Sequence, residues 1–323
     1  MIEKTAKILI TGANGFLGRH IVQELHQQGF NNLLTPSSKE VNLKNWHQTS
    51  NFFWFNRPEA VIHCAANVGG IGYNKKYPAQ LISDNLHMGL NILEACISRH
   101  DYVPIRKVVM VGSVCAMPLD SPVPFKETDL WNGYPEPTNA AYGVAKRALI
   151  TAGEAFRKQY ELNVVNLILA NLYGPGERIS EADSHVALGI MLKMHRAKMN
   201  GGQVILWGTG TPTRDLLYVK DAARAIRMAL ECYEGDEPVN VATGQDISIY
   251  DLARRIQDIV GYTGYETWDG TQPNGQIKRR LDVSKAKRLF GFAAQISLEN
   301  GLKEMYAWLK SALEEKSGER DCR

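Results

Sequence analysis

The chain has 323 residues, with a hydrophobic fraction of 44%, a charged fraction of 22% and a formal net charge of +3. This is long enough for one large domain or two ordinary ones. The charge is too small to indicate a nucleic-acid partner, and no apolar run approaches the ~20 residues of a membrane helix. Five cysteines without a CxxC pair indicate reduced thiols. We therefore expect a cytoplasmic protein without a metal, nucleic-acid or membrane partner.

Strands and helices alternate through the first half of the sequence. Short apolar runs predict buried strands at 7–12, 31–38, 60–66, 107–113 and 163–171. Amphipathic patterns predict helices at 15–29, 85–100 and 140–160. The first strand begins so close to the start that we expect no signal peptide. This order is typical of an α/β protein with a Rossmann-type, doubly wound parallel sheet.

The pattern becomes less regular after residue 175, where glycine, proline and aromatic residues are frequent. We expect a dinucleotide-binding domain formed by 1–175 and about 215–248, and a smaller α/β substrate lobe formed by 176–214 and 249–315. The polar segment 316–323 is expected to be a flexible tail.

A glycine-rich loop lies between the first predicted strand and the first helix. Gly12, Gly15 and Gly18 follow the spacing G-x-x-G-x-x-G, which lets the backbone turn tightly and approach a pyrophosphate at the helix N-terminus. An ordinary loop gives the same pattern when context is ignored, but here a strand precedes it and a helix follows. We expect Asn14, Phe16 and Leu17 to belong to the same cofactor site.

The turn after the second strand bears on the choice of cofactor. NAD sites usually carry an Asp or Glu there for the ribose 2′-hydroxyl, whereas this chain has Ser37, Ser38 and Lys39. These side chains suit a 2′-phosphate, which favours NADP. A solvated turn is the alternative, and Arg19 is a second source of positive charge.

A serine, a tyrosine and a lysine form a second pattern. Ser113 ends a predicted strand, and Tyr142 and Lys146 lie four residues apart on one helix face. An ammonium ~4 Å from the phenol, at an effective dielectric of ~20, stabilises the phenolate by ~4 kcal/mol, or about three pKa units. We therefore predict a Tyr142 pKa near 7, suited to proton transfer with a sugar oxygen. A solvated helix face is the alternative for such a pair alone.

Cys115 follows Ser113 by two residues, so both side chains face one side of an extended segment. Hydride transfer does not require a thiol. The cysteine therefore indicates a second reaction at the same place.

These features resemble the extended short-chain dehydrogenase/reductases and, more narrowly, the GDP-L-fucose synthase family. The likeness covers nearly the whole chain and is carried by NVGGIGYN, GSVCAMP, EPTNAAYGVAK, NLYGP, DSHV, WGTGTPTRDLLYVKD and LDVSK. It implies NADPH and a GDP-4-keto-6-deoxy sugar, which is epimerised at C3 and C5 and reduced at C4. Cys115 and His185 would then exchange the C3 and C5 protons as base and acid. Further cofactor contacts are implied at Ala65, Ala66, Val111, Gly112, Asn171, Leu172 and, beside their catalytic roles, Tyr142, Lys146 and His185.

The same resemblance implies the substrate contacts and the assembly. Lys193 and Arg214 would hold the diphosphate, and Trp207, Asn274 and Asp282 would line the sugar-nucleotide pocket. A homodimer would form through a four-helix bundle made of helices 84–100 and 140–160 of each subunit.

The chain also departs from the family pattern. Asn14 replaces an expected Arg, Asn274 replaces an Asp, and Val186-Ala187 replaces an Ile-Pro pair. These departures bear on the cofactor preference and on the exact sugar or base, and not on the reaction class. Two alternatives stay open: a reductase or epimerase-reductase that acts on another GDP-4-keto sugar, such as a deoxyheptose or colitose precursor, and a non-catalytic NADP-sensing protein of the same fold.

Overall fold

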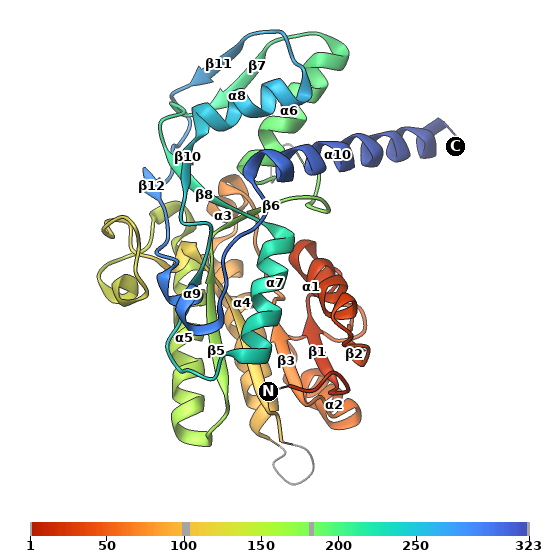
Figure 1. Ribbon diagram of the computed structural model, residues 1–323, viewed down its shortest axis with the longest axis vertical. Coiled ribbons are helices and arrows are strands. Elements are labelled where there is room, and N and C mark those ends of the chain that lie inside the picture. Colours follow the sequence, from red (N-terminus) through yellow and green to blue (C-terminus); the bar gives the residue numbers. More distant parts are fainter. Residues whose placement is uncertain (1, 99–103, 181–183, 322–323) are drawn as a thin grey trace.

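The computed structural model describes residues 2–98, 104–180 and 184–321, with the backbone alone for 316–321. Its largest sheet has six parallel strands in the order β2-β1-β3-β4-β5-β9 (Figure 1). These strands are β1 (Ile8–Thr11), β2 (Leu33–Leu34), β3 (Ala60–His63), β4 (Lys107–Ser113), β5 (Val164–Leu169) and β9 (Val239–Val241). After β2 the chain returns to place β3 on the other side of β1, and such a switch point opens a crevice at the carboxyl ends of the strands.

Helices cover both faces of this sheet, because successive strand side chains point to opposite faces. On one face, Ile8 and Ile10 pack in one core cluster with Ile21 of α1 and Ile226 of α7. On the other face, Leu9 packs in a cluster with residues of α2, α4 and α5. The helices that contribute to these two clusters are α1 (Phe16–Gln27), α2 (Trp46–Asn56), α4 (Pro78–Ile97), α5 (Ala140–Tyr160), α7 (Val219–Cys232) and α9 (Ser284–Phe290). The α/β class and the doubly wound parallel sheet predicted from the sequence are confirmed.

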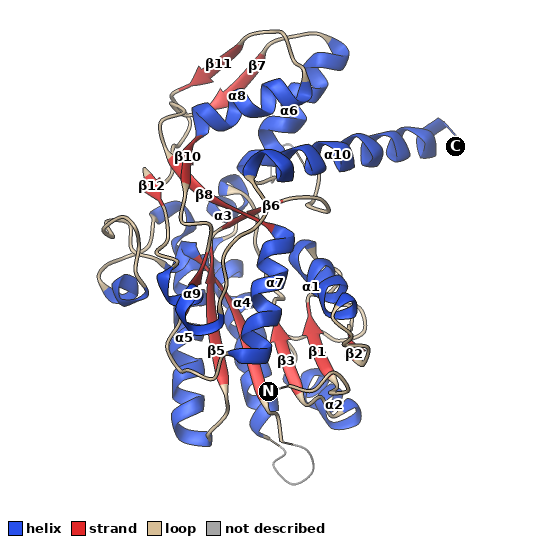
Figure 2. Cartoon of the chain, in the orientation of Figure 1, coloured by secondary structure: helices blue, strands red, loops and turns tan. Residues whose placement is uncertain are grey.

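Smaller sheets lie beyond the carboxyl ends of the large one (Figure 2). Strand β8 (Thr213–Tyr218) pairs with β6 (Asn171–Tyr173), β10 (Asp246–Ser248) and β12 (Lys278–Arg279), and β7 (Val204–Trp207) pairs with β11 (Glu266–Asp269). Helices α6 (Val186–Asn200), α8 (Ile249–Val260) and α10 (Leu298–Asp321) share a separate core with these strands, which includes Leu188, Ile256 and Met305. The remaining helical segments are α3 (Ile71–Lys76) and the 3₁₀ turns Val114–Ala116, Glu127–Trp131 and Pro137–Asn139.

Some local features differ from the sequence expectations. Helix α2 was not predicted, although Asn45 caps it by accepting a hydrogen bond from the Gln48 backbone N–H at 3.0 Å. Helix α9 falls in the range expected for the substrate lobe, yet its Ala286 and Phe290 pack into the core of the large sheet. The exact domain boundaries stay a prediction. The flexible tail expected at 316–323 also stays a prediction, because α10 continues to Asp321 and residues 322–323 lie outside the described residues.

Candidate active site

A cavity of about 640 Å³ lies between the large sheet and the smaller sheets. Its near wall is formed where the main strands end, at Gly12, Cys64, Ser113 and Ala170. The predicted catalytic and cofactor residues that line it are Gly12, Gly15, Phe16, Leu17, Gly18, Ala65, Ala66, Val111, Gly112, Ser113, Cys115, Tyr142, Lys146, Asn171, Leu172 and His185. The switch point therefore brings together residues from six separate stretches of the sequence.

The glycine loop forms one end of this cavity. Gly12 has a φ of +70°, and a Cβ there would lie 2.8 Å from the Ala65 backbone, so the position favours glycine. A Cβ on Gly18 would lie 2.0 Å from the Gly12 carbonyl oxygen. Helix α1 begins after Gly15 without a side-chain cap, so N–H groups of its first turn remain available to an anion.

The turn after β2 lies outside the cavity lining, and so does Asn14. Ser38 and Lys39 are exposed, while the Ser37 backbone N–H donates to Glu40 Oε2 at 2.7 Å. The prediction from the sequence considered Ser37, Ser38 and Lys39 and did not include the carboxylate of Glu40, the next residue. Arg19 is directed to the glycine loop, where it donates to the carbonyl oxygens of Asn14 and Gly15 at 3.0 and 3.2 Å.

Ser113, Cys115, Tyr142 and Lys146 lie on two segments that pack closely. Ser113 ends β4, and its Oγ accepts a hydrogen bond from the Cys115 N–H at 3.2 Å. Helix α5 approaches this segment so closely that a Cβ on Gly143 would lie 2.1 Å from the Cys115 carbonyl oxygen. Tyr142 and Lys146, one turn apart on α5, are both buried and line the same cavity as Cys115.

The prediction that Lys146 lowers the Tyr142 pKa toward 7 is not met in this structure. Burial raises the Tyr142 pKa well above its ordinary value, the Cys115 charge adds to the rise, and a hydrogen bond with Ser113 opposes it. Lys146 Nζ donates to the Val111 carbonyl oxygen at 2.9 Å and lies 5.7 Å from the centre of the Tyr142 ring. Burial also lowers the Lys146 pKa to about 8. The prediction counted the charge of the lysine and left out the desolvation of both groups.

His185 has a carboxylate partner that the sequence did not reveal. Glu177 Oε1 accepts from His185 Nδ1 at 2.8 Å and from the His185 backbone N–H at 2.7 Å. Glu177 is 5% exposed. Burial lowers the His185 pKa, but the hydrogen bond and the charge of Glu177 together outweigh it, so the pKa is raised. The imidazole therefore holds a proton more readily than a free histidine.

The far wall of the cavity carries positive charge. The lining of the cavity includes the cations Arg178, Lys193, Arg214 and Arg279, together with Lys146 of α5, and Glu177 is the only carboxylate among the described lining residues. Arg214 is buried on β8, and burial lowers its pKa to about 9, with the neighbouring Arg279 adding to the effect. Such a surface suits an anionic ligand with several charges.

The predicted substrate residues are only partly brought together. Lys193, Trp207, Arg214 and Asn274 line the cavity, and Lys193 Nζ lies 5.7 Å from the centre of the Trp207 ring. Asp282 does not line it: its carboxylate accepts from the Ser284 N–H at 2.8 Å at the start of α9. We therefore correct the expectation for Asp282, whose carboxylate binds the first backbone N–H of α9 and is absent from the cavity lining.

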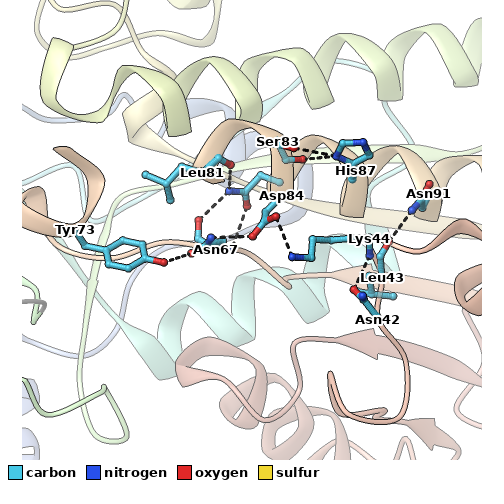
Figure 3. A network of polar contacts seen from close by, with 11 residues as sticks. Asn42, Leu43, Lys44, Asn67, Tyr73, Leu81, Ser83, Asp84, His87 and Asn91 are labelled. Atoms are coloured by element: carbon cyan, nitrogen blue, oxygen red, sulfur yellow. Dashed lines mark hydrogen bonds and ion pairs between the residues drawn. The ribbon is translucent and has the colours of Figure 1, made fainter. Parts of the chain in front are cut away.

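A polar network fixes the loop 64–70, which lines the cavity with Gly69 and Gly70. Figure 3 shows Asn67 between Tyr73 and Asp84: Tyr73 Oη donates to Asn67 Oδ1 at 2.9 Å, and Asn67 Nδ2 donates to Asp84 Oδ2 at 3.0 Å. Lys44 Nζ lies 3.0 Å from Asp84 Oδ1. The loop is thereby tied to α3, α4 and the segment before α2.

A second, buried chain of contacts ties the same loop to the start of α5. Asn74 Nδ2 donates to Asn139 Oδ1 at 2.8 Å, and Asn139 Nδ2 donates to Glu136 Oε2 at 2.8 Å. Asn74 Oδ1 in turn accepts from the Gly69 N–H at 3.3 Å. The motif NVGGIGYN is therefore held against the helix that carries Tyr142.

Within the described ranges, no group of three or more His, Cys, Asp or Glu side chains is placed to hold a metal ion. None of the helices described is both long and apolar enough to cross a membrane.

Comparison with known proteins agrees with this geometry. A sequence model of the NAD dependent epimerase/dehydratase family matches residues 8–242. A GDP-L-fucose synthase of Arabidopsis thaliana is 37% identical over 309 residues, covering 95% of this chain and 94% of the relative.

Two solved structures are also similar. A GDP-6-OMe-4-keto-L-xylo-heptose reductase of C. jejuni superposes with a TM-score of 0.91 at 27% identity, covering 96% of this chain and 99% of that one. A GDP-L-fucose synthetase of Naegleria fowleri bound to NADP has a TM-score of 0.88 at 27% identity, covering 97% of both chains.

Proposed function

This chain belongs to the NAD dependent epimerase/dehydratase family and, within it, to the GDP-L-fucose synthases, and from that premise we propose that it is an NADPH-dependent epimerase-reductase. Its substrate is a GDP-4-keto-6-deoxy sugar, which it epimerises at C3 and C5 and reduces at C4. The observation that carries the proposal is the convergence of Cys115 and His185 with Ser113, Tyr142 and Lys146 in one cavity.

The residues of the glycine loop fit NADP. Gly12 and Gly18 leave room that a Cβ would fill, and the first turn of α1 has no side-chain cap. Asn171 Oδ1 is buried in the cavity wall without a hydrogen-bond partner in the described chain. When bound, NADPH supplies the hydride for C4. Lys39 and Ser38 are exposed and available to the 2′-phosphate.

Reduction at C4 requires a proton for the oxygen that becomes a hydroxyl. Tyr142 donates it, and its raised pKa keeps the phenol protonated until charge develops on that oxygen. Ser113 hydrogen-bonds the same oxygen. Lys146, held by the Val111 carbonyl oxygen at 2.9 Å, stabilises the phenolate that remains.

Epimerisation uses the acidity that the C4 ketone gives to the protons at C3 and C5. Cys115 removes a proton as thiolate, and His185 delivers a proton to the opposite side of the same carbon. Glu177 raises the His185 pKa, which favours the protonated imidazole in this step. The sugar therefore lies between η1, which carries Cys115, and the start of α6, which His185 precedes.

The rest of the substrate lies along the positive wall. Arg214 and Lys193 hold the diphosphate, because guanidinium and ammonium groups bind phosphate oxygens. Trp207 and Asn274 flank the nucleotide. Asp282 is left out of this site, since its carboxylate accepts from the Ser284 N–H at the start of α9.

Product identification tests this function. The protein is incubated with NADPH and a panel of GDP-4-keto sugars, and the products are identified by NMR. We expect a 4-hydroxy product inverted at C3 and C5. Consumption of NADPH without inversion would show that the protein is a reductase and not an epimerase. No turnover with any sugar would refute the proposal.

A second candidate is action on a GDP-4-keto heptose or colitose precursor. The structural likeness to the C. jejuni heptose reductase favours it, and the same panel separates the two substrates. A non-catalytic NADP sensor is disfavoured, because Tyr142 and Lys146 are both present and line the cavity.

The expected homodimer and cytoplasmic location belong to the same proposal. Helices α4 and α5 pack together on one face of the sheet, where a Cβ on Gly89 would lie 2.4 Å from Leu149. Their outer faces would form the four-helix bundle with a second subunit. Sedimentation equilibrium should give a dimer near twice 36.1 kDa, and a persistent monomer would contradict it. Cys64, Cys96, Cys115 and Cys232 are free, which agrees with a reducing compartment.

A further inference from the structure

Two buried arginines lie side by side at the end of the cavity that holds Cys115. Arg214 on β8 and Arg279 on β12 are register partners, with exposed fractions of 8% and 5%. Within the described chain neither guanidinium forms an ion pair with a carboxylate: Arg214 donates to the carbonyl oxygens of Thr213, Asn274 and Gln276. Buried cations without an anionic partner are costly, so an anion that reaches this place is strongly favoured.

The orientation of Arg279 is fixed by a chain of hydrogen bonds. Its Nε donates to Gln276 Oε1 at 2.8 Å, and Gln276 Nε2 donates to the carbonyl oxygens of Pro118 and Leu119 at 3.1 and 2.8 Å. Pro118 lies three residues after Cys115. The guanidinium is therefore held to the segment that carries the thiol, and its Nη1 lies 3.7 Å from Cys115 Sγ.

We propose that Arg279 is a positioning residue that stabilises negative charge on the Cys115 sulfur and directs that sulfur into the cavity. This inference rests on the proposed function, in which Cys115 is the base for epimerisation, and it adds the cation that offsets the negative charge of the sulfur in that role. Arg279 and Glu177 thereby have parallel roles, because each is a buried charged group in contact with one of the two residues that exchange protons with the sugar.

The other groups around the sulfur agree with this role. Arg214 approaches from β8 and adds positive charge, and Ser113 offers a neutral hydroxyl. Tyr142 on α5 is kept in its phenol form, so it does not repel a thiolate. Glu136 acts electrostatically on Arg214 but makes its own hydrogen bonds to Thr138 and Asn139. Positive charge therefore dominates at Sγ.

Alkylation by iodoacetamide tests the proposal on the protein without substrate. A thiolate attacks the CH₂ carbon, an S–C bond forms, and iodide leaves, so the rate reports the thiolate fraction. Peptide mass spectrometry after timed quenching resolves Cys115 from the other cysteines, and exposed Cys232 serves as the internal reference. Arg279→Gln should slow the alkylation of Cys115 at pH 7 on the order of 10-fold and leave that of Cys232 unchanged.

Two further variants make the test specific. Arg280→Gln removes the same charge one residue away, from a side chain that is 37% exposed and contacts Asp246, and should leave the rate as in the parent. Arg279→Lys keeps the charge on a shorter side chain, and its rate should fall between those of the parent and Arg279→Gln even if the latter is destabilised. An equal or faster Cys115 rate in Arg279→Gln would overturn the inference. Because no sugar is present, this result is independent of the product assay that decides the proposed function.

Discussion

The two sides of the cavity are built from different chemical groups. On the side of the large sheet the wall consists mainly of backbone and small residues, such as Gly12, Gly18 and Ala65. On the side of the smaller sheets it consists of long charged or aromatic side chains, such as Trp207, Arg214 and Arg279. The first wall leaves space for a ligand because its residues have small side chains or none. The second wall places charged and aromatic groups in the cavity because its side chains are long.

This difference explains how one site can hold two ligands and carry out two reactions. A wall of glycine and helix N–H groups binds a phosphate whatever the rest of the ligand is. A wall of fixed charges selects one ligand and sets the protonation state of its catalytic neighbours. Ser113, Cys115, Tyr142 and His185 line the same cavity, so the proposed hydride transfer and proton exchange would share one sugar.

The largest effect is expected from Tyr142→Phe. Phenylalanine keeps the ring and removes the proton donor for C4, so the rate of NADPH oxidation should fall by roughly 10²- to 10⁴-fold. Exchange of the C3 and C5 protons with D₂O should continue, since Cys115 and His185 remain. The measurement combines NADPH absorbance with NMR of the sugar. A loss of both NADPH oxidation and proton exchange would show that the two reactions do not use separate residues.

Cys115→Ser should have the complementary effect. A serine hydroxyl is a much poorer base than a thiolate, so exchange at C3 and C5 should fall by roughly 10²-fold or more. Any NADPH oxidation that remains should give the 4-reduced sugar without inversion, which NMR identifies. His185→Asn is the companion variant and should give a different exchange pattern. Parent rates of inversion in Cys115→Ser would make the thiol a packing residue.

Glu177→Gln should change the pH dependence of epimerisation. Glu177 raises the His185 pKa against the effect of burial, so without its charge the protonated form is lost at a lower pH. The activity should therefore fall on the alkaline side, with a loss on the order of 10-fold near pH 8 that shrinks as the pH is lowered. Glu177→Asp keeps the charge and should retain more activity. An unchanged pH profile would show that Glu177 does not set the charge of His185.

The smallest effect is expected at the cofactor turn. NADPH should be preferred over NADH when kcat/KM is compared, and Lys39→Ala should reduce that preference by roughly 3- to 10-fold, because an exposed charge contributes modestly. Lys158→Ala, at the end of α5, is the control. Equal use of both cofactors by the parent would contradict the interpretation of this turn, and would direct attention to Glu40.

The sequence predicted those parts of the site that depend on local spacing. Gly12, Gly15 and Gly18 shape one loop, Tyr142 and Lys146 share one helix face, and Cys115 follows Ser113 on one segment. Each relation holds within a few residues, so a pattern specifies it.

Other parts depend on contacts that no local pattern specifies. Arg279 reaches Cys115 because β12 pairs with β8, a register decided by the fold. Glu177 contacts His185 although the two residues lie eight positions apart and neither belongs to a helix or strand whose periodicity would bring them together. The Tyr142 pKa was misjudged because desolvation depends on packing around the ring. Asp282 was placed in the pocket by resemblance, whereas the start of α9 engages its carboxylate.

Isotope incorporation by the unmodified protein tests the central claim most directly. The protein turns over the GDP-4-keto-6-deoxy sugar with NADPH in D₂O, and the product is examined by NMR. If one cavity performs both reactions, the product carries deuterium at C3 and C5, with both centres inverted, and protium at C4, which comes from the cofactor. A reduced product with protium at C3 and C5 would contradict the account, because Cys115 and His185 would then have exchanged no proton.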